Sequence, residues 1–189
     1  MENAVVQRHY TFEEYWEMEL QSEIKHEFID GQIIAMPGVK LKHNKITLKF
    51  CFALMSALEN SNFEVFMESV KLQIESKKDY TYPDICVASK EGINPDDLLI
   101  TNAVLVVEVL SEGTKLYDKV DKFLRYKKIP TLQYYVLVDT DTVFVDVYRK
   151  LPDGEHWEDD IYTQLSDTIP LPILGIQLNL TDIYEGISF

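Results

Sequence analysis

The chain has 189 residues and a mass of 22.0 kDa, and 46% of its residues are hydrophobic. A chain of this size and composition buries enough apolar surface to fold without disulfides, which excludes a disordered tail or a stapled mini-protein. Its 18 Lys and Arg against 32 Asp and Glu give a formal net charge of −14, and a uniformly acidic surface would repel nucleic acid and anionic lipid.

Export and membrane signals are not evident in the sequence. The opening MENAVVQRHY has an acidic second residue and no apolar core of signal-peptide length. The longest uncharged stretch with apolar character, residues 168–181, contains two prolines and a glycine and is too short to span a bilayer. Cys51 and Cys86 lie in apolar patterns typical of unpaired core thiols. We expect a cytoplasmic protein with no membrane contact.

The first third of the chain predicts a helix, a hairpin and a longer helix. Thr11 and Glu14 form a capping box, which indicates a helix start. Asp30-Gly31 separates two short β-prone runs and favours a two-residue hairpin turn. From residue 40 to residue 58 no Gly or Pro interrupts a helical pattern. The apolar residues near helical spacing are Leu41, Ile46, Leu48, Phe52, Met55 and Leu58.

The remainder alternates strands with one more helix. FEVFMESVKLQI, YPDICVA and AVLVVEVL predict three antiparallel strands. Thr114 is a candidate cap for a helix from Lys115 to about Lys128, stopped by Pro130. Its expected apolar face is Leu116, Val120, Phe123 and Leu124. Two strands around residues 140–141 follow, and the tail predicts short extended elements and a helical turn at 182–184. We expect one α/β domain over residues 1–189.

The net charge is unevenly distributed along the chain. Residues 1–39 carry 2 basic and 8 acidic side chains, and residues 130–189 carry 2 and 11, whereas residues 40–129 carry 14 and 13. The basic residues therefore gather on the two longer helices. Two interpretations stay open: a solvated helix face, or a cationic groove that contacts phosphates.

Two carboxylates stand out in the apolar strands. Glu108 interrupts the seven apolar residues of AVLVVEVL, a pattern typical of a strand buried on both faces. A buried carboxylate needs a cation or a shifted pKa, so Glu108 faces a metal, a basic side chain or a cleft, or else reaches solvent at the strand end. Asp84 begins the neighbouring apolar run after Pro83. Two such carboxylates on adjacent strands favour a hard divalent cation.

Further polar residues accompany these two. Asp118, Lys122 and Arg125 are spaced to share roughly one helix face, although an Asp–Lys pair at that spacing is also consistent with a simple surface bridge. Glu27 precedes the hairpin turn, and His43 opens the first long helix. The other histidines have no ligand spacing that indicates zinc, and the sequence contains no P-loop, G-x-G-x-x-G or G-x-S-x-G motif.

The order of HEFIDG, a helix-opening His, YPDICV, VVEVLS, DKVDKFLRYKK and a YYVLVD strand resembles the Uma-type restriction-endonuclease-like proteins of the PD-(D/E)XK nuclease superfamily. The similarity runs from about Thr11 to Arg149. The resemblance implies an α/β (α+β) restriction-endonuclease-like fold, with a central mixed sheet flanked by helices and additional β-hairpins.

The resemblance also implies site residues. The superfamily's metal-binding Asp and Glu fall on Asp84 and Glu108, and Glu27 matches an additional acidic ligand. Leu110 stands where the superfamily usually has a catalytic lysine, and Lys122 is the matching candidate on the following helix. The same comparison gives His43 and Asp118 as accessory positions.

These matches lead to a hypothesis of Mg²⁺- or Mn²⁺-dependent hydrolysis of phosphodiester bonds, with DNA as the favoured nucleic acid and a homodimer as the favoured assembly. Asp84, Glu108 and Glu27 are expected to hold the metal, and Lys122 to complete the catalytic set. The alternative is a non-catalytic oligomerisation or protein-interaction module that retains the nuclease fold. Expected contacts with nucleic acid come from Lys45, Lys49, Lys115, Lys119 and Arg125.

Overall fold

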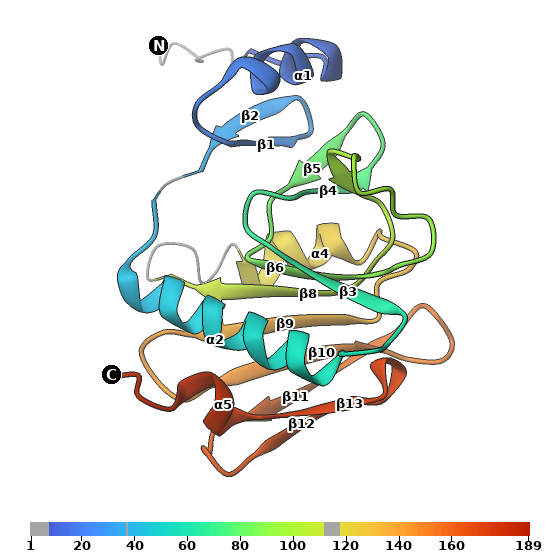
Figure 1. The fold of residues 1–189 in the computed structure, drawn as a ribbon. Helices are drawn as coiled ribbons and strands as arrows, with labels where there is room; N and C mark the ends of the chain where they lie inside the picture. Colours follow the sequence, from blue (N-terminus) through green and yellow to red (C-terminus); the bar gives the residue numbers. More distant parts are fainter. Residues whose placement is uncertain (1–7, 37, 112–117) are drawn as a thin grey trace, which may run out of the picture.

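A six-stranded mixed sheet forms the centre of the computed structural model, which describes residues 8–36, 38–111 and 118–189 (Figure 1). Its strand order is β11-β10-β9-β8-β6-β3, and only the β8–β9 pair within it is parallel. The strands are β3 (Phe63–Met67), β6 (Ile85–Ser89), β8 (Ala103–Leu110), β9 (Tyr134–Asp139), β10 (Val145–Lys150) and β11 (Trp157–Tyr162). Every residue of β8 is buried, because this central strand is covered on both faces.

A second sheet has five strands in the order β2-β1-β5-β4-β7. They are β1 (His26–Ile29), β2 (Gln32–Ala35), β4 (Lys71–Glu75), β5 (Asp79–Thr81) and β7 (Leu99–Ile100). A two-stranded sheet joins β12 (Thr168–Leu171) to β13 (Ile176–Asn179), with a short 3₁₀ helix η2 (Pro172–Leu174) between them.

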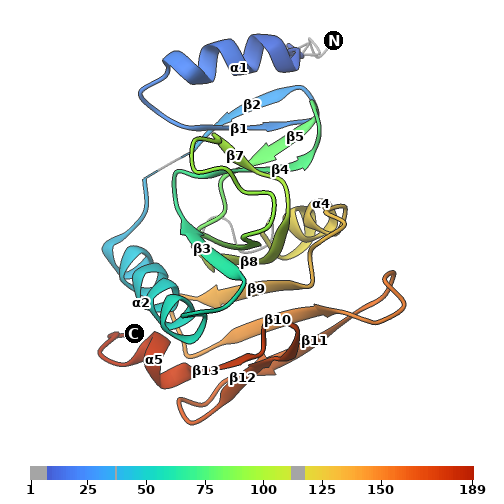
Figure 2. The same cartoon turned by 45° about the vertical axis from the view of Figure 1, so that its right-hand side comes forward.

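The helices cover different parts of these sheets (Figure 2). Helix α2 (Leu41–Ala57) and helix α5 (Leu180–Tyr184) pack with β12 and β13 against one face of the central sheet. A π-helical turn, η1 (Asp118–Lys122), leads into α4 (Phe123–Tyr126) on the opposite face. Helix α1 (Phe12–Gln21) packs aromatic side chains on the five-stranded sheet. Within the described ranges, no helix has the length and apolar character needed to cross a bilayer.

Several sequence expectations are confirmed. Thr11 caps α1 in a capping box with Glu14, and Asp30-Gly31 turns between β1 and β2 with positive φ angles at both residues. Strands β9 and β10 form the expected hairpin, and α5 supplies the final helical turn, beginning at Leu180. Both cysteines are buried free thiols.

The expected strand over FEVFMESVKLQI is wrong, because the structure divides this run between two sheets. Strand β3 pairs with β6 in the central sheet, while β4 pairs with β5 in the other. Between them, Glu68 and Ser69 have positive φ angles of 25° and 67°, which a continuous strand does not permit. The sequence expectation also missed the short strands β5 and β7.

The apolar faces expected for the two longer helices are largely wrong. In α2 the inward face consists of His43, Ile46, Thr47, Phe50, Cys51 and Leu54, while four of the six expected apolar residues are exposed. In the second helix, Val120 and Leu124 are exposed, whereas Asp118 and Tyr126 are buried. The expected cap Thr114, together with Lys115 and Leu116, lies outside the described residues. The inner faces of both helices thus include polar groups that serve the site described next.

Candidate active site

Strand register places Asp84 and Glu108 side by side. Ile85 at the start of β6 pairs with Val107 of β8, so Asp84, one residue before Ile85, comes next to Glu108, one residue after Val107. The charge of Asp84 accordingly acts on Glu108 and raises its pKa. The Val109 amide donates a 2.7 Å hydrogen bond to Oδ2 of Asp84, which fixes that carboxylate against β8. The two carboxylates singled out in the sequence therefore share one location.

Lys122 of η1 lies among three buried carboxylates. Its Nζ is 3.0 Å from Oε1 of Glu108, 3.3 Å from Oδ1 of Asp118 and 3.8 Å from Oε1 of Glu27. Glu27 comes from β1, so this one ammonium joins the two sheets and the helical turn. The resemblance implied a lysine on the helix after β8, and the structure places the Lys122 ammonium beside Glu108.

Tyr126 is a member of this cluster that sequence reasoning missed. Its hydroxyl donates a 2.7 Å hydrogen bond to Oε1 of Glu108 and lies 3.2 Å from the hydroxyl of Thr81. Asp118, Lys122 and Tyr126 are four residues apart, and this spacing was the available signal. The helix face expected from the sequence consisted of Asp118, Lys122 and Arg125. In the structure, however, the Arg125 side chain forms ion pairs with Asp79 and Asp30.

His43 supports Asp84 from the other side. Its Nε2 lies 3.3 Å from Oδ2 of Asp84, and its Nδ1 lies 3.5 Å from the hydroxyl of Thr47, one helical turn along α2. Burial alone would lower the pKa of His43, but the hydrogen bond and charge of Asp84 prevail and raise it. His43 thus orients the Asp84 carboxylate.

Burial and neighbouring charges shift the pKa values of Glu108, Glu27 and Lys122. Burial, together with the charges of Asp84 and Asp118, raises the pKa of Glu108 to about 8 against the opposing effect of Lys122. Burial also raises the pKa of Glu27. For Lys122, burial acts to lower the pKa, but the charges of Glu108, Glu27 and Asp118 raise it well above its usual value. The ammonium is therefore protonated at neutral pH.

Two hollows border the cluster, one at Asp84 and one at His43. Asp84 borders a groove of about 340 Å³ whose walls include Tyr82, Pro83 and Glu68. His43 borders a smaller pocket of about 80 Å³ on the other side, together with Ser111. Glu108 is almost inaccessible behind them. A ligand would therefore approach the cluster past Asp84.

The carboxylates fit a hard divalent cation. Among the described residues, the hydrogen bonds and ion pairs of Glu108 use Oε1 and those of Asp84 use Oδ2. Oε1 of Glu27 is buried and receives no hydrogen bond from any residue that the structure describes. No group of three His, Cys, Asp or Glu side chains in these ranges forms a ready-made metal site. Mg²⁺ commonly uses only one or two protein carboxylates and completes its shell with water and phosphate oxygens, which suits Asp84 and Glu108.

The described basic residues expected to contact nucleic acid lie outside the carboxylate cluster. Lys45 donates to the Gly186 carbonyl at 2.8 Å, and Lys49 borders a groove beside α5. Lys119 pairs with Asp146 at 3.1 Å. Lys115 lies outside the described residues, and Arg125 is held in the ion pairs noted above. Unlike Lys122, the described members of this set form no hydrogen bond or ion pair with Asp84, Glu108, Glu27 or Asp118.

Comparison with known proteins places the chain within one family. The family described as "Uma2: Putative restriction endonuclease" matches residues 12–181. An uncharacterized Synechocystis protein, slr1290, is 36% identical over 177 residues, which cover 94% of this chain and 92% of that protein. A second one, sll1609, is 35% identical over 147 residues, covering 77% of this chain and 83% of its own.

A solved structure shows the same fold. The crystal structure of a putative nuclease belonging to DUF820 from Anabaena variabilis superposes with a TM-score of 0.76 at 20% sequence identity. The match covers 94% of this chain and 99% of that one. The expected restriction-endonuclease-like architecture, a mixed sheet flanked by helices, is therefore confirmed.

Proposed function

The chain belongs to the Uma2 family, and we propose that it is a nuclease that hydrolyses phosphodiester bonds in DNA with the help of Mg²⁺ or Mn²⁺. The family description and the nuclease-like fold of the Anabaena protein support hydrolysis of nucleic acid. The description as a restriction endonuclease favours DNA as the substrate.

The observation that carries this proposal is the position of Lys122. The residue two positions after Glu108 is Leu110, so β8 itself offers no lysine to the site. Lys122 nevertheless reaches Oε1 of Glu108 at 3.0 Å from the following helical turn. Burying an ammonium and several carboxylates together costs desolvation energy, so such clusters are found most often at functional sites. A metal-dependent nuclease site requires this combination of charges.

Each group of the chain has a distinct task in the proposed reaction. Asp84 and Glu108 would hold the cation, with Glu27 as a further oxygen donor or a partner for a bound water. A cation bound there supplies Lewis-acid polarisation of the scissile phosphate and lowers the pKa of a coordinated water. Lys122 stays protonated, so it offsets the charge that develops on the phosphate and does not act as the base. His43 and Tyr126 orient Asp84 and Glu108.

The direct test is nicking of supercoiled plasmid with and without Mg²⁺ or Mn²⁺. Asp84→Asn and Glu108→Gln each remove a metal-holding charge at nearly constant volume, and we expect activity to fall by about 10²-fold or more. Glu64→Gln, an exposed position on β3, makes the same chemical change away from the cluster and should leave activity unchanged. Unchanged nicking in Glu108→Gln would exclude this site, and a single-stranded RNA substrate in the same assay tests the choice of DNA.

A non-catalytic interaction module with the same fold makes a different prediction. Such a module has no need for a cation, so titration calorimetry would detect no binding at millimolar Mg²⁺ or Mn²⁺. The proposed nuclease should bind the cation, and Asp84→Asn should weaken that binding.

We also propose that the protein acts as a homodimer, because a pair of active sites suits cleavage of both strands of a DNA duplex.

A further inference from the structure

Helix α2 carries a row of large apolar side chains on its solvent side. Leu41, Leu48, Phe52 and Met55 are 90%, 56%, 72% and 58% exposed. Their spacing of seven, four and three residues keeps all four on one narrow face of the helix, opposite the face that packs on the central sheet. Isolated exposed apolar residues are ordinary, but a continuous row of this kind marks an interaction surface.

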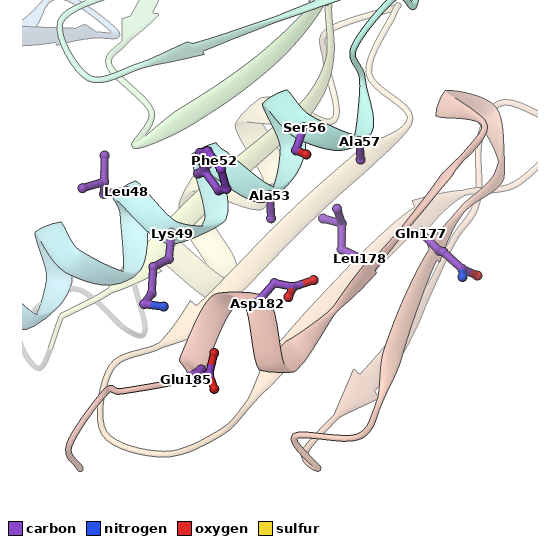
Figure 3. Close-up of a pocket in the computed structure, with 10 residues that line it drawn as sticks. All are labelled: Leu48, Lys49, Phe52, Ala53, Ser56, Ala57, Gln177, Leu178, Asp182 and Glu185. Carbon is purple, nitrogen blue, oxygen red and sulfur yellow. The ribbon is translucent and has the colours of Figure 1, made fainter.

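A groove runs along one edge of this row. It has a volume of about 690 Å³ and lies between α2 and the β13–α5 segment (Figure 3). Leu48, Phe52 and Ala53 line the α2 side, and Leu178 lies on the opposite wall. In Figure 3, Lys49 extends from α2 toward α5, which supplies Asp182 and Glu185. We name the row of four side chains and this groove together the α2 face.

The charges around the α2 face are segregated. Between Lys40 and Leu58 the chain has four lysines and no acidic residue, and these lysines lie in the first half of the helix. Glu59 follows the helix end, and Asp182 and Glu185 border the groove. Along α2 the charge therefore runs from lysines in its first half to Glu59 just after its end, which is complementary to itself when one copy is reversed, while Asp182 and Glu185 lie beside the groove with Lys49.

We propose that the α2 face is the interface between two copies of this chain, with the two α2 helices antiparallel around a two-fold axis near Phe52. The inference deepens the homodimer proposed above, although its evidence does not depend on nuclease activity. In a two-fold interface the same patch faces itself. Lys45 and Glu59 lie seven residues before and after Phe52, so each lysine would meet the glutamate of the other copy.

This arrangement accounts for features that a single copy leaves unexplained. The Phe52 side chains would pack together at the axis, flanked by Leu48 and Met55, and would withdraw the most exposed aromatic ring of α2 from water. Tyr126 and Lys122, which contact Glu108, come from the other face of the central sheet, and none of the four side chains of the row lines the groove beside Asp84. DNA is not expected to bind the apolar row of the α2 face, because its four side chains carry no charge that could pair with phosphates.

The first test is the mass of the purified full chain in solution by sedimentation velocity. The wild type should sediment as a dimer, with twice the 22.0 kDa mass of one chain, and Phe52→Glu should sediment as a monomer. Ile161→Glu introduces the same charge at an exposed apolar position on β11 and should remain dimeric. Circular dichroism should show that both variants keep the wild-type fold, and the melting temperature should depend on protein concentration in the wild type and Ile161→Glu but not in Phe52→Glu. A monomeric wild type, or a dimeric Phe52→Glu, would overturn the proposal.

A charge reversal tests the antiparallel register. Lys45→Glu and Glu59→Lys should each weaken the dimer at least tenfold, and the double variant should recover most of the affinity. Failure of the double variant to recover would reject the Lys45–Glu59 pairing. Glu108→Gln should dimerise normally, so loss of the nuclease function and loss of this interface give different results.

Discussion

Lys122 and Glu108 lie 3.0 Å apart, although they are on different elements and the residue two positions after Glu108 is a leucine. The ammonium comes from the π-helical turn η1 and enters the cluster beside the end of β8. The lysine charge beside Glu108 therefore comes from the helical turn and not from the strand. This relationship gives the most direct prediction about catalysis.

Replacing Lys122 by Met should separate catalysis from metal binding. We expect the nicking rate to fall by about 10²- to 10³-fold, because the charge that offsets the developing phosphate charge is lost. Binding of Mn²⁺, measured by calorimetry, should be retained or become tighter, since a competing cation has left the carboxylates. Lys122→Arg keeps the charge and should recover part of the rate. Equal loss of rate and Mn²⁺ binding in Lys122→Met would contradict this role.

Tyr126 should stabilise the fold through Glu108. Tyr126→Phe removes a 2.7 Å hydrogen bond to a buried carboxylate, so the free energy of unfolding should decrease by about 1–3 kcal/mol. Urea unfolding followed by circular dichroism measures this change. Tyr162→Phe is the control. Tyr162 lies on β11, the edge strand of the central sheet, and its replacement should change the free energy of unfolding by less than about 0.5 kcal/mol. A Tyr126 effect no larger than that of the control would show that this bond contributes nothing net.

The stability of the metal-free protein should depend on pH through Glu108. Its pKa is raised to about 8 in the folded protein, so at intermediate pH the folded state holds a proton that the unfolded chain has released. This contribution is fully present below the unfolded pKa of about 4.5 and is lost as the pH rises through about 8. The free energy of unfolding should thus fall by up to about 1.4 kcal/mol per pH unit in this window.

Two measurements check this pH dependence. Glu108→Gln cannot titrate, so its urea-unfolding free energy should vary less between pH 5 and pH 8 than that of the wild type. Because a cation binds the ionised carboxylate, added Mg²⁺ should raise the melting temperature more at pH 8 than at pH 6. A wild-type curve as flat as that of Glu108→Gln would contradict the raised pKa.

The candidate site could be predicted from the sequence where charges interrupt apolar strands. Glu108 in β8 and Asp84 beside β6 are informative because an unpartnered carboxylate is costly among Val, Ile and Leu. The resemblance added Glu27 and Lys122, and the structure brings all four together. Tyr126 was not predicted as a site residue, because an aromatic residue at helical spacing is typical of the hydrophobic core. Its role depends on the hydroxyl, which hydropathy does not register.

The orientation of α2 could not be predicted for a related reason. The helix is apolar on two sides, with Ile46, Phe50 and Leu54 on one and Leu48 and Phe52 on the other. Periodicity identifies a helix but does not choose between two apolar faces. The inward face also includes His43, whose partner Asp84 lies far away in sequence, so tertiary contacts decided the choice.

Arg125 should act as a structural anchor, although the sequence suggested a contact with nucleic acid. Its Nη1 lies 3.2 Å from Oδ1 of the fully buried Asp79 and 3.1 Å from Oδ2 of Asp30, so it ties α4 to the five-stranded sheet. Arg125→Ala leaves Asp79 with the longer 3.5 Å ion pair to Lys128 and a 3.1 Å hydrogen bond from the Asp30 amide, and we expect a loss of about 2–3 kcal/mol in urea unfolding. Lys77→Ala breaks an exposed pair with Glu13 and should cost less than about 1 kcal/mol. Wild-type stability in Arg125→Ala, combined with weaker DNA binding, would instead support the nucleic-acid contact.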